Sequence, residues 1–306
     1  MDSKRGRLLV LEYSNNDQSG PQFLLIHERK TQGGLRSLTE FNRKLLACIR
    51  SRVELYEWSS DINEKELHLK RRQFTFMNAY DFKTKCNTFL IGGSLFGISL
   101  LIYKPSEQSF ERIRPHQLPE MTAVEIIEDD SFLSADISSN LLKFHRDEND
   151  RQHLQQIGRF PTGEMINRFR YGSLATQHHT VNSARIPVAR SILFGTNSGG
   201  IGLVVRIPEK LFTFLRDLEN RLLKNICSVD EIEHLSWPSV DRDDGVESVV
   251  GFVDGDLIES FLDLSGDQMS NVINGMQMVD DETSDMKRKA TVDDVIKIVE
   301  GLIQMN

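Results

Sequence analysis

A few side chains in this 306-residue sequence have types and spacings that could do chemistry. His178 and His179 are adjacent imidazoles, which are common metal ligands, but no Cys, Asp or Glu lies at ligand spacing from them. The run Asp241–Gly245 resembles a calcium loop, yet its glycine comes one position early for an EF-hand and no glutamate follows at the right distance. We therefore predict a polar surface loop at both places and no metal site.

Two further segments have a structural explanation. The glycine-rich run Phe194–Leu203 lacks the Gly-Lys-Ser/Thr ending of a phosphate-binding loop and lies between two predicted strands rather than before a helix. A hairpin turn with glycine at positive φ explains this run better. Asp254 and Asp256 could act as an acid–base pair. They stand directly before a predicted helix, however, where helix capping explains them.

The remaining chemical signals are weak. No serine lies in a GxSxG elbow. The basic clusters Lys70–Arg72 and Met286–Lys289 are typical of solvated faces rather than of nucleic-acid sites. Cys48, Cys86 and Cys227 are far apart and form no CxxC motif, which indicates a reducing intracellular compartment without a zinc site or disulfide framework. The sequence thus predicts no catalytic residue, no metal and no cofactor, and favours a binding protein over an enzyme.

Charge and hydropathy limit the kinds of partner. The formal net charge is −8, so the chain has no general electrostatic attraction for phosphate backbones or anionic membranes. No apolar run approaches the about 18 residues of a membrane helix. We therefore expect no membrane contact, and contact with DNA only indirectly, through a partner protein.

The elements that would position these residues follow an internal repeat. Four two-strand segments begin at Leu45, Phe89, Phe132 and Ile192, with spacings of 44, 43 and 60 residues. Each follows another predicted strand, and these strands are Leu35–Phe41, Asn78–Phe82, Thr122–Ile127 and Met165–Tyr171. Three or four strands in every about 43–45 residues are typical of β-propeller blades, which bury both sheet faces by stacking. The Trp-Asp and Gly-His pairs of ordinary WD40 blades are missing.

The repeat has two irregularities. The longest spacing includes a polar insertion at residues 177–189. At the other end, Arg7–Tyr13 lies 46 residues before Val53 and matches the same strand of the repeat, without the strands that should precede it. We predict a mainly β fold, an incomplete propeller of the seven-bladed type with about four blades plus this orphan strand.

The pattern becomes helical after Pro208. Apolar residues recur at helical spacing from Leu211 to Ile226. Three further helices are predicted at Asp256–Leu264, Asp267–Met276 and Thr291–Met305. We therefore predict two domains, a partial propeller at residues 1–207 and a helical domain at residues 208–306.

Several long strings carry a resemblance to a known family. They are Glu40–Trp58, Leu193–Val204, Asp217–Trp237, Gly251–Ser265 and Met286–Leu302. Together they resemble the large subunits of UV-damaged-DNA-binding proteins. The related large subunits of the cleavage and polyadenylation specificity factor and of a U2 splicing factor share the Gly-Asp-Leu element but diverge after it.

The resemblance implies a non-enzymatic scaffold of three propellers and a helical domain, of which this chain would be a fragment with most of the third propeller. It implies an adaptor in the nucleus, and also in the cytoplasm, that recruits WD-repeat substrate receptors to a cullin–RING E3 ubiquitin ligase in DNA damage repair. The cullin would bind only through an upstream propeller that is not in this sequence. The alternative is a nucleic-acid-binding subunit of the pre-mRNA 3′-end cleavage or splicing machinery.

The resemblance also implies a receptor-binding surface on blade loops and inner strands. The matching positions here are Phe96, Met121, Ala123, Glu125, Asn167 and Phe169. Around Phe96 and Glu120 the sequence departs from the arginine and tryptophan that the family pattern implies. These departures predict a different choice of receptor.

Overall fold

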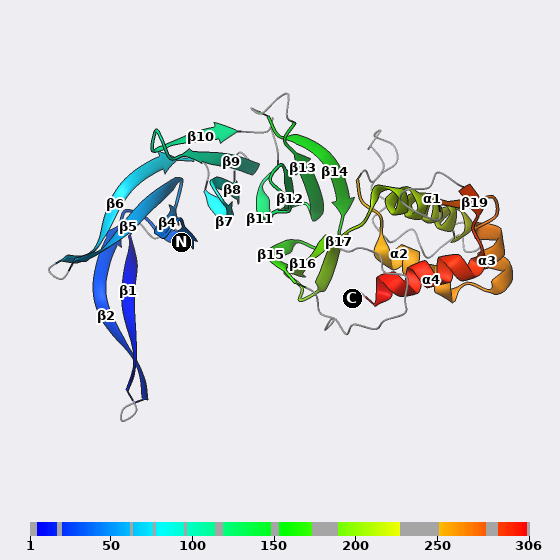
Figure 1. Ribbon diagram of the computed structural model, residues 1–306, viewed down its shortest axis with the longest axis horizontal. Helices are drawn as coiled ribbons and strands as arrows, with labels where there is room; N and C mark the ends of the chain where they lie inside the picture. Colours follow the sequence, from blue (N-terminus) through cyan, green and yellow to red (C-terminus); the bar gives the residue numbers. More distant parts are fainter. Residues whose placement is uncertain are drawn as a thin grey trace. The chain divides into compact units, whose positions relative to one another are not determined.

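The computed structural model describes residues 5–16, 20–61, 64–75, 78–94, 97–113, 119–147, 153–172, 189–226, 251–279 and 287–304. This part of the chain consists mainly of antiparallel strands, followed by helices (Figure 1). It divides into two compact units, residues 1–158 with 164–168 and residues 159–163 with 169–306. The domain boundary expected at residues 207/208 stays a prediction.

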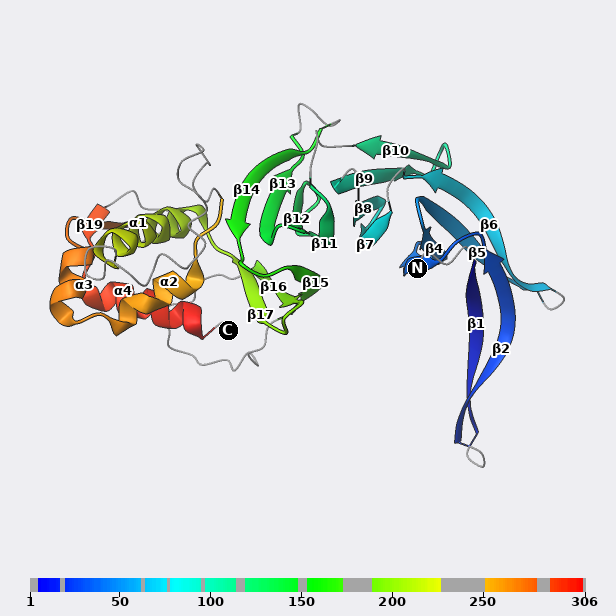
Figure 2. The ribbon, with the colours of Figure 1, turned by 180° about the vertical axis from the view of Figure 1, so that it is seen from behind.

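The first unit contains one two-stranded sheet and three four-stranded sheets, each built from consecutive strands. Their bounds are β1 Gly6–Asn16 and β2 Gly20–Thr31; β3 Leu35–Phe41, β4 Lys44–Ile49, β5 Arg52–Asp61 and β6 Glu64–Phe74; β7 Ala79–Lys85, β8 Thr88–Gly93, β9 Gly97–Lys104 and β10 Ser109–Ile113; β11 Met121–Ile126, β12 Ser131–Asp136, β13 Asn140–His145 and β14 Gln155–Pro161. Both ribbon views show the four-stranded sheets following one another in chain order (Figures 1 and 2). The predicted incomplete propeller is confirmed.

Each inner sheet of this unit buries both of its faces. On β4, Leu46 and Cys48 pack toward β7–β9, in a cluster with Phe89. The alternate residues Ala47 and Ile49 pack toward β1, in a cluster with Leu8. Because successive side chains of a strand point to opposite faces, two covered faces require an uninterrupted apolar run. This requirement explains why these strands lack polar alternation.

Polar links between first strands follow the repeat spacing. The hydroxyls of Thr39 and Thr84 lie 3.5 Å apart and are 45 residues apart in sequence. The Thr122 hydroxyl donates to the Ile166 carbonyl at 2.6 Å, across 44 residues. The repeat found in the sequence therefore corresponds to physical contact between equivalent positions of neighbouring sheets.

The strand expected to be an orphan, Arg7–Tyr13, has a partner. It lies within β1, which pairs along its whole length with β2. The strand β2 was not predicted because it begins with Gly20-Pro21, a pair of residues typical of a loop. The strand Arg7–Tyr13 was expected to lack the strands that precede it in a full blade, and these two strands have no counterpart among the described residues. Its pairing with β2 is the feature that the sequence did not reveal.

A three-stranded sheet contains β15 Ile166–Tyr171, β16 Ala189–Thr196 and β17 Ile201–Arg206. The glycine-rich run forms the β16–β17 turn, in which Gly199 has a φ of 98°. The Thr196 hydroxyl accepts from the Gly200 N–H at 2.9 Å. The predicted hairpin turn with a positive-φ glycine is confirmed.

The second unit contains the helices. Their bounds are α1 Glu209–Ile226, α2 Gly255–Glu259, a 3-10 turn at Ser260–Asp263, α3 Gly266–Val272 and α4 Val292–Ile303, and a small hairpin joins β18 Gln277–Val279 to β19 Lys287–Lys289. Leu218, Phe261 and Val295 are buried in one core that joins α1, the 3-10 turn and α4. Asp254 caps α2 as predicted, since its side chain accepts from the N–H groups of Asp256 and Leu257.

The helices expected at Asp256–Leu264 and Asp267–Met276 are shorter than predicted. The first changes to a 3-10 turn at Ser260, and the second ends at Val272, shortly before Gly275 with a φ of 77°. A residue in the left-handed region commonly follows the end of a helix. The hairpin of β18 and β19 was not predicted.

Candidate functional site

The first strands β3, β7 and β11 begin at one edge of the sheets in the first unit, and the turns between second and third strands lie at the same edge. Backbone hydrogen bonds join these pieces: the Ala79 N–H donates to the Arg50 carbonyl at 3.5 Å and the Ile137 N–H to the Glu120 carbonyl at 3.1 Å. We call this edge the turn rim. It is closely packed, because a Cβ on Gly93 would lie 2.1 Å from the Asn78 carbonyl oxygen.

The turn rim exposes side chains that are common in protein interfaces. Phe74, Tyr80 and Ile137 are 51%, 39% and 50% exposed, and Arg50 is exposed beside them in the β4–β5 turn. Aromatic residues and arginine are enriched in interfaces and in their binding hot spots. The strands β4, β7 and β12 are largely buried, so Arg50, Tyr80 and Ile137 extend from a rigid base.

Charged contacts fix the first strands below the rim. Asp81 of β7 is 2% exposed and accepts from the Val124 N–H of β11 at 3.1 Å. Asp81 also pairs with the guanidinium of Arg168, which is 49% exposed. Lys83 of β7 pairs with Glu125 of β11. These contacts join three strands that are far apart in the sequence.

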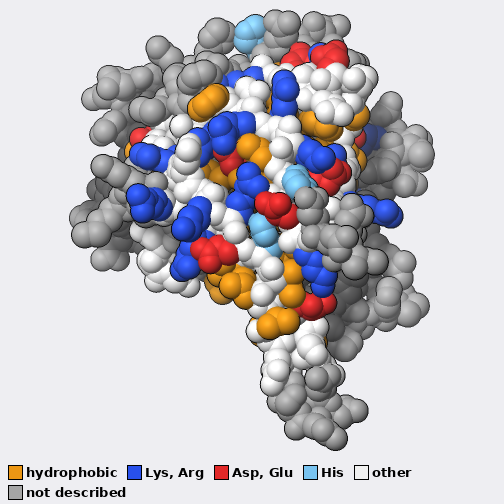
Figure 3. Space-filling model, turned by 90° about the vertical axis from the view of Figure 1, so that its left-hand side faces the viewer, with side chains coloured by type: hydrophobic (Ala, Val, Ile, Leu, Met, Phe, Trp, Pro, Cys, Tyr) orange, Lys and Arg blue, Asp and Glu red, His pale blue; other side chains and the backbone are white. Residues whose placement is uncertain are grey.

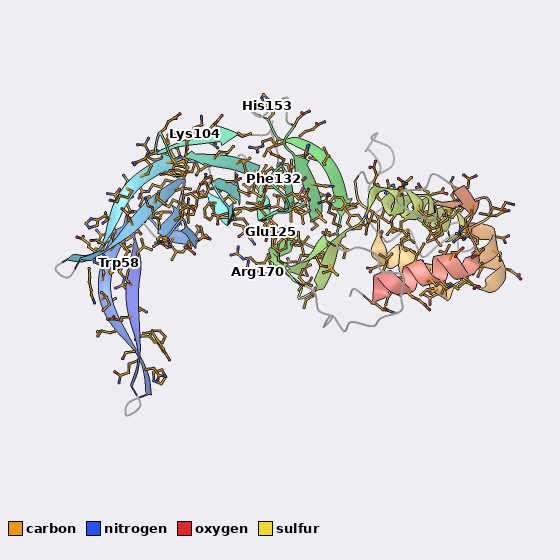
Figure 4. All side chains as sticks on the ribbon, in the orientation of Figure 1. Trp58, Lys104, Glu125, Phe132, His153 and Arg170 are labelled. Atoms are coloured by element: carbon orange, nitrogen blue, oxygen red, sulfur yellow. The ribbon has the colours of Figure 1, made fainter. Side chains whose placement is uncertain are left out.

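The expected receptor-binding residues have different environments. Met121, Ala123 and Phe169 are buried, Glu125 is buried in its pair with Lys83, and Asn167 is exposed. Phe96 lies outside the described residues, as do His178, His179, Asp241–Gly245 and Met286. Figure 4 shows Glu125 on the first-strand side of the unit and Lys104 on the fourth-strand side. Whether the six expected positions bind a receptor stays a prediction.

The exposed rim residues Arg50, Phe74, Tyr80 and Ile137 were not predicted from the sequence. Tyr80 was placed only within the predicted strand Asn78–Phe82. The available signal was an aromatic or apolar residue at the end of a strand or directly after it, as in Phe74 and Ile137. Such a residue is only partly covered by its neighbours, so it is a candidate for an exposed contact.

A buried carboxylate stands behind the rim. The Glu54 Oε1 atom lies 3.1 Å from Arg52 Nε and 2.7 Å from Arg72 Nε, and Glu54 also accepts from the Tyr56 hydroxyl. Burial, followed by the contact with Glu54, raises the pKa of Tyr56 to about 12. The guanidinium of Arg29 lies 5.3 Å from the centre of the Tyr56 ring. One carboxylate therefore faces two guanidiniums in this region.

The basic cluster Lys70–Arg72 lies on β6, where part of its charge is compensated. Lys70 Nζ and Lys44 Nζ lie 2.8 Å and 3.3 Å from the carboxylate of Glu57, and these lysines lower the pKa of Glu57. Figure 3 shows Lys and Arg side chains among acidic and hydrophobic ones on this side of the molecule. This mixed surface agrees with a solvated face.

Within the described ranges, no group of three or more His, Cys, Asp or Glu side chains could hold a metal ion. In the same part of the chain, no helix is long and apolar enough to cross a membrane.

Comparison with known proteins places the chain in a family. Residues 1–263 match the model of the CPSF A subunit region family. The chain belongs to this family. The match covers the sheets of the first unit together with α1 and α2, so the CPSF A subunit region includes every strand that forms the turn rim.

Curated relatives of this CPSF A family member include DNA damage-binding protein 1 of Drosophila melanogaster, 38% identical over 311 residues, which covers 100% of this chain and 26% of the relative. DNA damage-binding protein 1a of Arabidopsis thaliana is 34% identical over 281 residues, 90% of this chain and 25% of that protein. DNA damage-binding protein 1 of Solanum lycopersicum is 34% identical over 292 residues, which cover 93% of this chain and 26% of that protein. The predicted resemblance is confirmed, and the chain spans about a quarter of these relatives' length.

Proposed function

We propose that this chain is a non-enzymatic scaffold that binds protein partners through the turn rim. The observation that carries the proposal is the exposure of Phe74, Tyr80, Ile137 and Arg50 at one edge of closely packed sheets. An exposed aromatic ring on a fixed backbone loses little conformational freedom when a partner covers it. The rim therefore suits recognition of a protein surface better than chemistry on a small molecule.

The relatives' names suggest the biological setting. Membership of the family and similarity to DNA damage-binding protein 1 support a role in DNA damage repair and in the nucleus. We propose that the partners are substrate receptors of WD-repeat type, and that the scaffold brings them to a cullin–RING ubiquitin ligase. Because the chain spans 26% of the fruit-fly relative, the cullin would be reached through another part of the assembly, and DNA through a partner.

Affinity purification of the tagged chain from cell nuclei, followed by mass spectrometry, tests this proposal. We expect ubiquitin-ligase receptors to be recovered, and we expect Tyr80→Lys and Ile137→Lys to lose them. Ser106→Lys is the matched control, since it adds the same charge at an exposed turn between β9 and β10, away from the rim. If the rim variants retain all receptors that the control retains, the rim is not the binding surface.

A second candidate follows from the family description, which names the CPSF A subunit. It is a nucleic-acid-binding subunit of the pre-mRNA 3′-end processing or splicing machinery. The net charge of −8 favours protein recognition over direct binding of RNA. Recovery of polyadenylation or splicing subunits instead of ligase receptors, together with salt-sensitive RNA binding by the purified chain, would favour this candidate.

A further inference from the structure

A hollow of about 240 Å³ lies in the turn rim beside the β4–β5 turn. The residues that line it include Arg50, Arg52, Phe74, Gln32 and Asn78. Pockets for small ligands usually have volumes of about 300–1,000 Å³. This hollow is smaller, so it suits one or two side chains of a peptide rather than a cofactor.

The surroundings hold Arg50 in place. A Cβ on Gly33 would lie 2.5 Å from Arg50 Cδ and 2.7 Å from Arg50 Cγ, so the arginine stem lies directly on the glycine backbone. Gly33 has a φ of 135°, a conformation that side-chain-bearing residues rarely adopt. The bare backbone at Gly33 therefore provides the space that the Arg50 stem occupies.

The lining of the hollow is basic. Arg50 and Arg52 line it, and none of the described residues that line it is acidic. Arg52 shares the carboxylate of Glu54 with Arg72, which lies outside the lining. This basic lining occurs in a chain whose overall charge is −8. A guanidinium binds carboxylates through charge-assisted hydrogen bonds.

We infer that this hollow binds an acidic segment of a protein partner, with a carboxylate at Arg50 and a neighbouring apolar side chain against the ring of Phe74. The inference rests on the proposed function, because it names the chemistry that the turn rim recognises. Phe74 is 51% exposed and adjoins the two arginines at the hollow, so charge and apolar surface lie together.

The test uses the full chain and a short fluorescein-labelled peptide in which glutamate and leucine alternate, with a glutamine–leucine peptide as the neutral match. Fluorescence anisotropy should show binding of the acidic peptide that weakens as salt increases. Arg50→Asn should weaken this binding about tenfold, because a charge-assisted contact is lost. Asparagine is well suited to this position, since Arg50 has a φ of 53° and Asn tolerates positive φ.

Arg43→Asn is the matched control. Arg43 also has a positive φ, 61°, and is exposed, but it lies in the β3–β4 turn at the opposite edge of the same sheet. We expect the control to bind the acidic peptide as the unaltered chain does. Phe74→Ala should reduce binding of both peptides, because it removes the apolar contact and leaves the charge. Melting temperatures of all variants show whether each remains folded.

Other outcomes would overturn the inference. If Arg50→Asn and Arg43→Asn weaken binding of the acidic peptide equally, the overall charge of the chain explains the binding and the hollow does not. If the acidic and the neutral peptide bind equally well, the carboxylate has no role in binding. Tighter binding of a single-stranded oligothymidylate, lost in Arg50→Asn, would assign the hollow to nucleic acid. If Tyr80→Lys abolishes receptor recovery while Arg50→Asn preserves both receptor recovery and peptide binding, the proposed function stands and this inference fails.

Discussion

Asp81 is one of several buried carboxylates of the first unit, and its partners come from two other strands. Its carboxylate accepts from the Val124 N–H and pairs with Arg168, which lies 87 residues away in sequence. Removing one partner of such a group leaves other polar atoms without their hydrogen bonds, which is more costly than losing an exposed contact. Asp81 therefore contributes, together with the Lys83–Glu125 pair, to the packing of β7 against β11 below the rim.

Asp81→Asn should reduce the free energy of unfolding by about 2 kcal/mol, because the charged contact with Arg168 is lost. The loss is not larger because Arg168 is half-exposed. Chemical denaturation measures this change. Asp129→Asn is the control: Asp129 pairs with Lys85 but is 83% exposed, so its loss should cost clearly less than the loss of Asp81. Equal effects of the two variants would contradict the importance assigned to Asp81.

The two described cysteines should react differently. Cys48 is buried in the core, and burial raises the pKa of its thiol to about 12, whereas Cys86 is exposed in the β7–β8 turn. The thiolate is the reactive form. Iodoacetamide should therefore modify Cys86 in the folded chain and Cys48 only after unfolding, as peptide mass spectrometry would show. Modification of Cys48 at the rate of Cys86 would disprove the predicted protection.

At the scale of elements, α4 begins with a complete capping box. Thr291 accepts from the Asp294 N–H, and Asp294 accepts from the Thr291 N–H and from Arg288. The hydrogen bonds from Arg288 and Thr291 hold the pKa of Asp294 well below its usual value of 3.8. A carboxylate with a lowered pKa stabilises the folded state above its unfolded pKa, and this contribution disappears as the pH falls below that value.

Asp294→Asn should therefore lower the melting temperature near neutral pH, and its difference from the unaltered chain should shrink below about pH 3.8. Asp293→Asn is the control, because Asp293 lies in the same first turn and outside the capping box. It should lose only the weaker favourable interaction with the helix dipole. A difference for Asp294→Asn that stays constant from neutral to acidic pH would show that its charge is not the cause.

The fold was readable in the sequence where the signal was local or repeated. The predicted strand Leu35–Phe41 has the same bounds in the structure, and Thr291 caps α4 as expected. The end of α3 at Val272 and the strand β2, which pairs with β1, were not predicted. The helix end depends on the turn that follows it. The strand depends on stabilising contacts that lie elsewhere in the fold. The rim residues were missed because exposure at a strand end is decided by neighbouring sheets.

At the scale of the whole molecule, one face of the β1–β2 sheet is apolar and exposed. Leu9, Leu11, Tyr13, Phe23 and Leu25 are each about half-exposed or more, whereas Leu8 on the opposite face is buried against β4. Exposed apolar sheet faces and open strand edges favour association. We therefore expect the isolated chain to associate as its concentration rises.

Leu11→Lys should reduce this association, measured by analytical ultracentrifugation, and should change the melting temperature little because Leu11 is 51% exposed. Leu8→Lys places the same charge three residues earlier, at a position only 3% exposed, so it should strongly destabilise the fold. If Leu11→Lys leaves the association unchanged, another surface is responsible for it.

The sequence by itself determined the repeat, most strand positions and the helix caps, because these follow from burial of both sheet faces and from hydrogen bonds within a few residues. Only the tertiary structure decided which side chains meet. Arg50 lies on Gly33, Glu54 pairs with Arg72, and Asp81 pairs with Arg168. Strand pairing within one sheet brings Glu54 to Arg72, whereas packing between sheets brings Asp81 to Arg168, and such contacts leave no local pattern in the sequence.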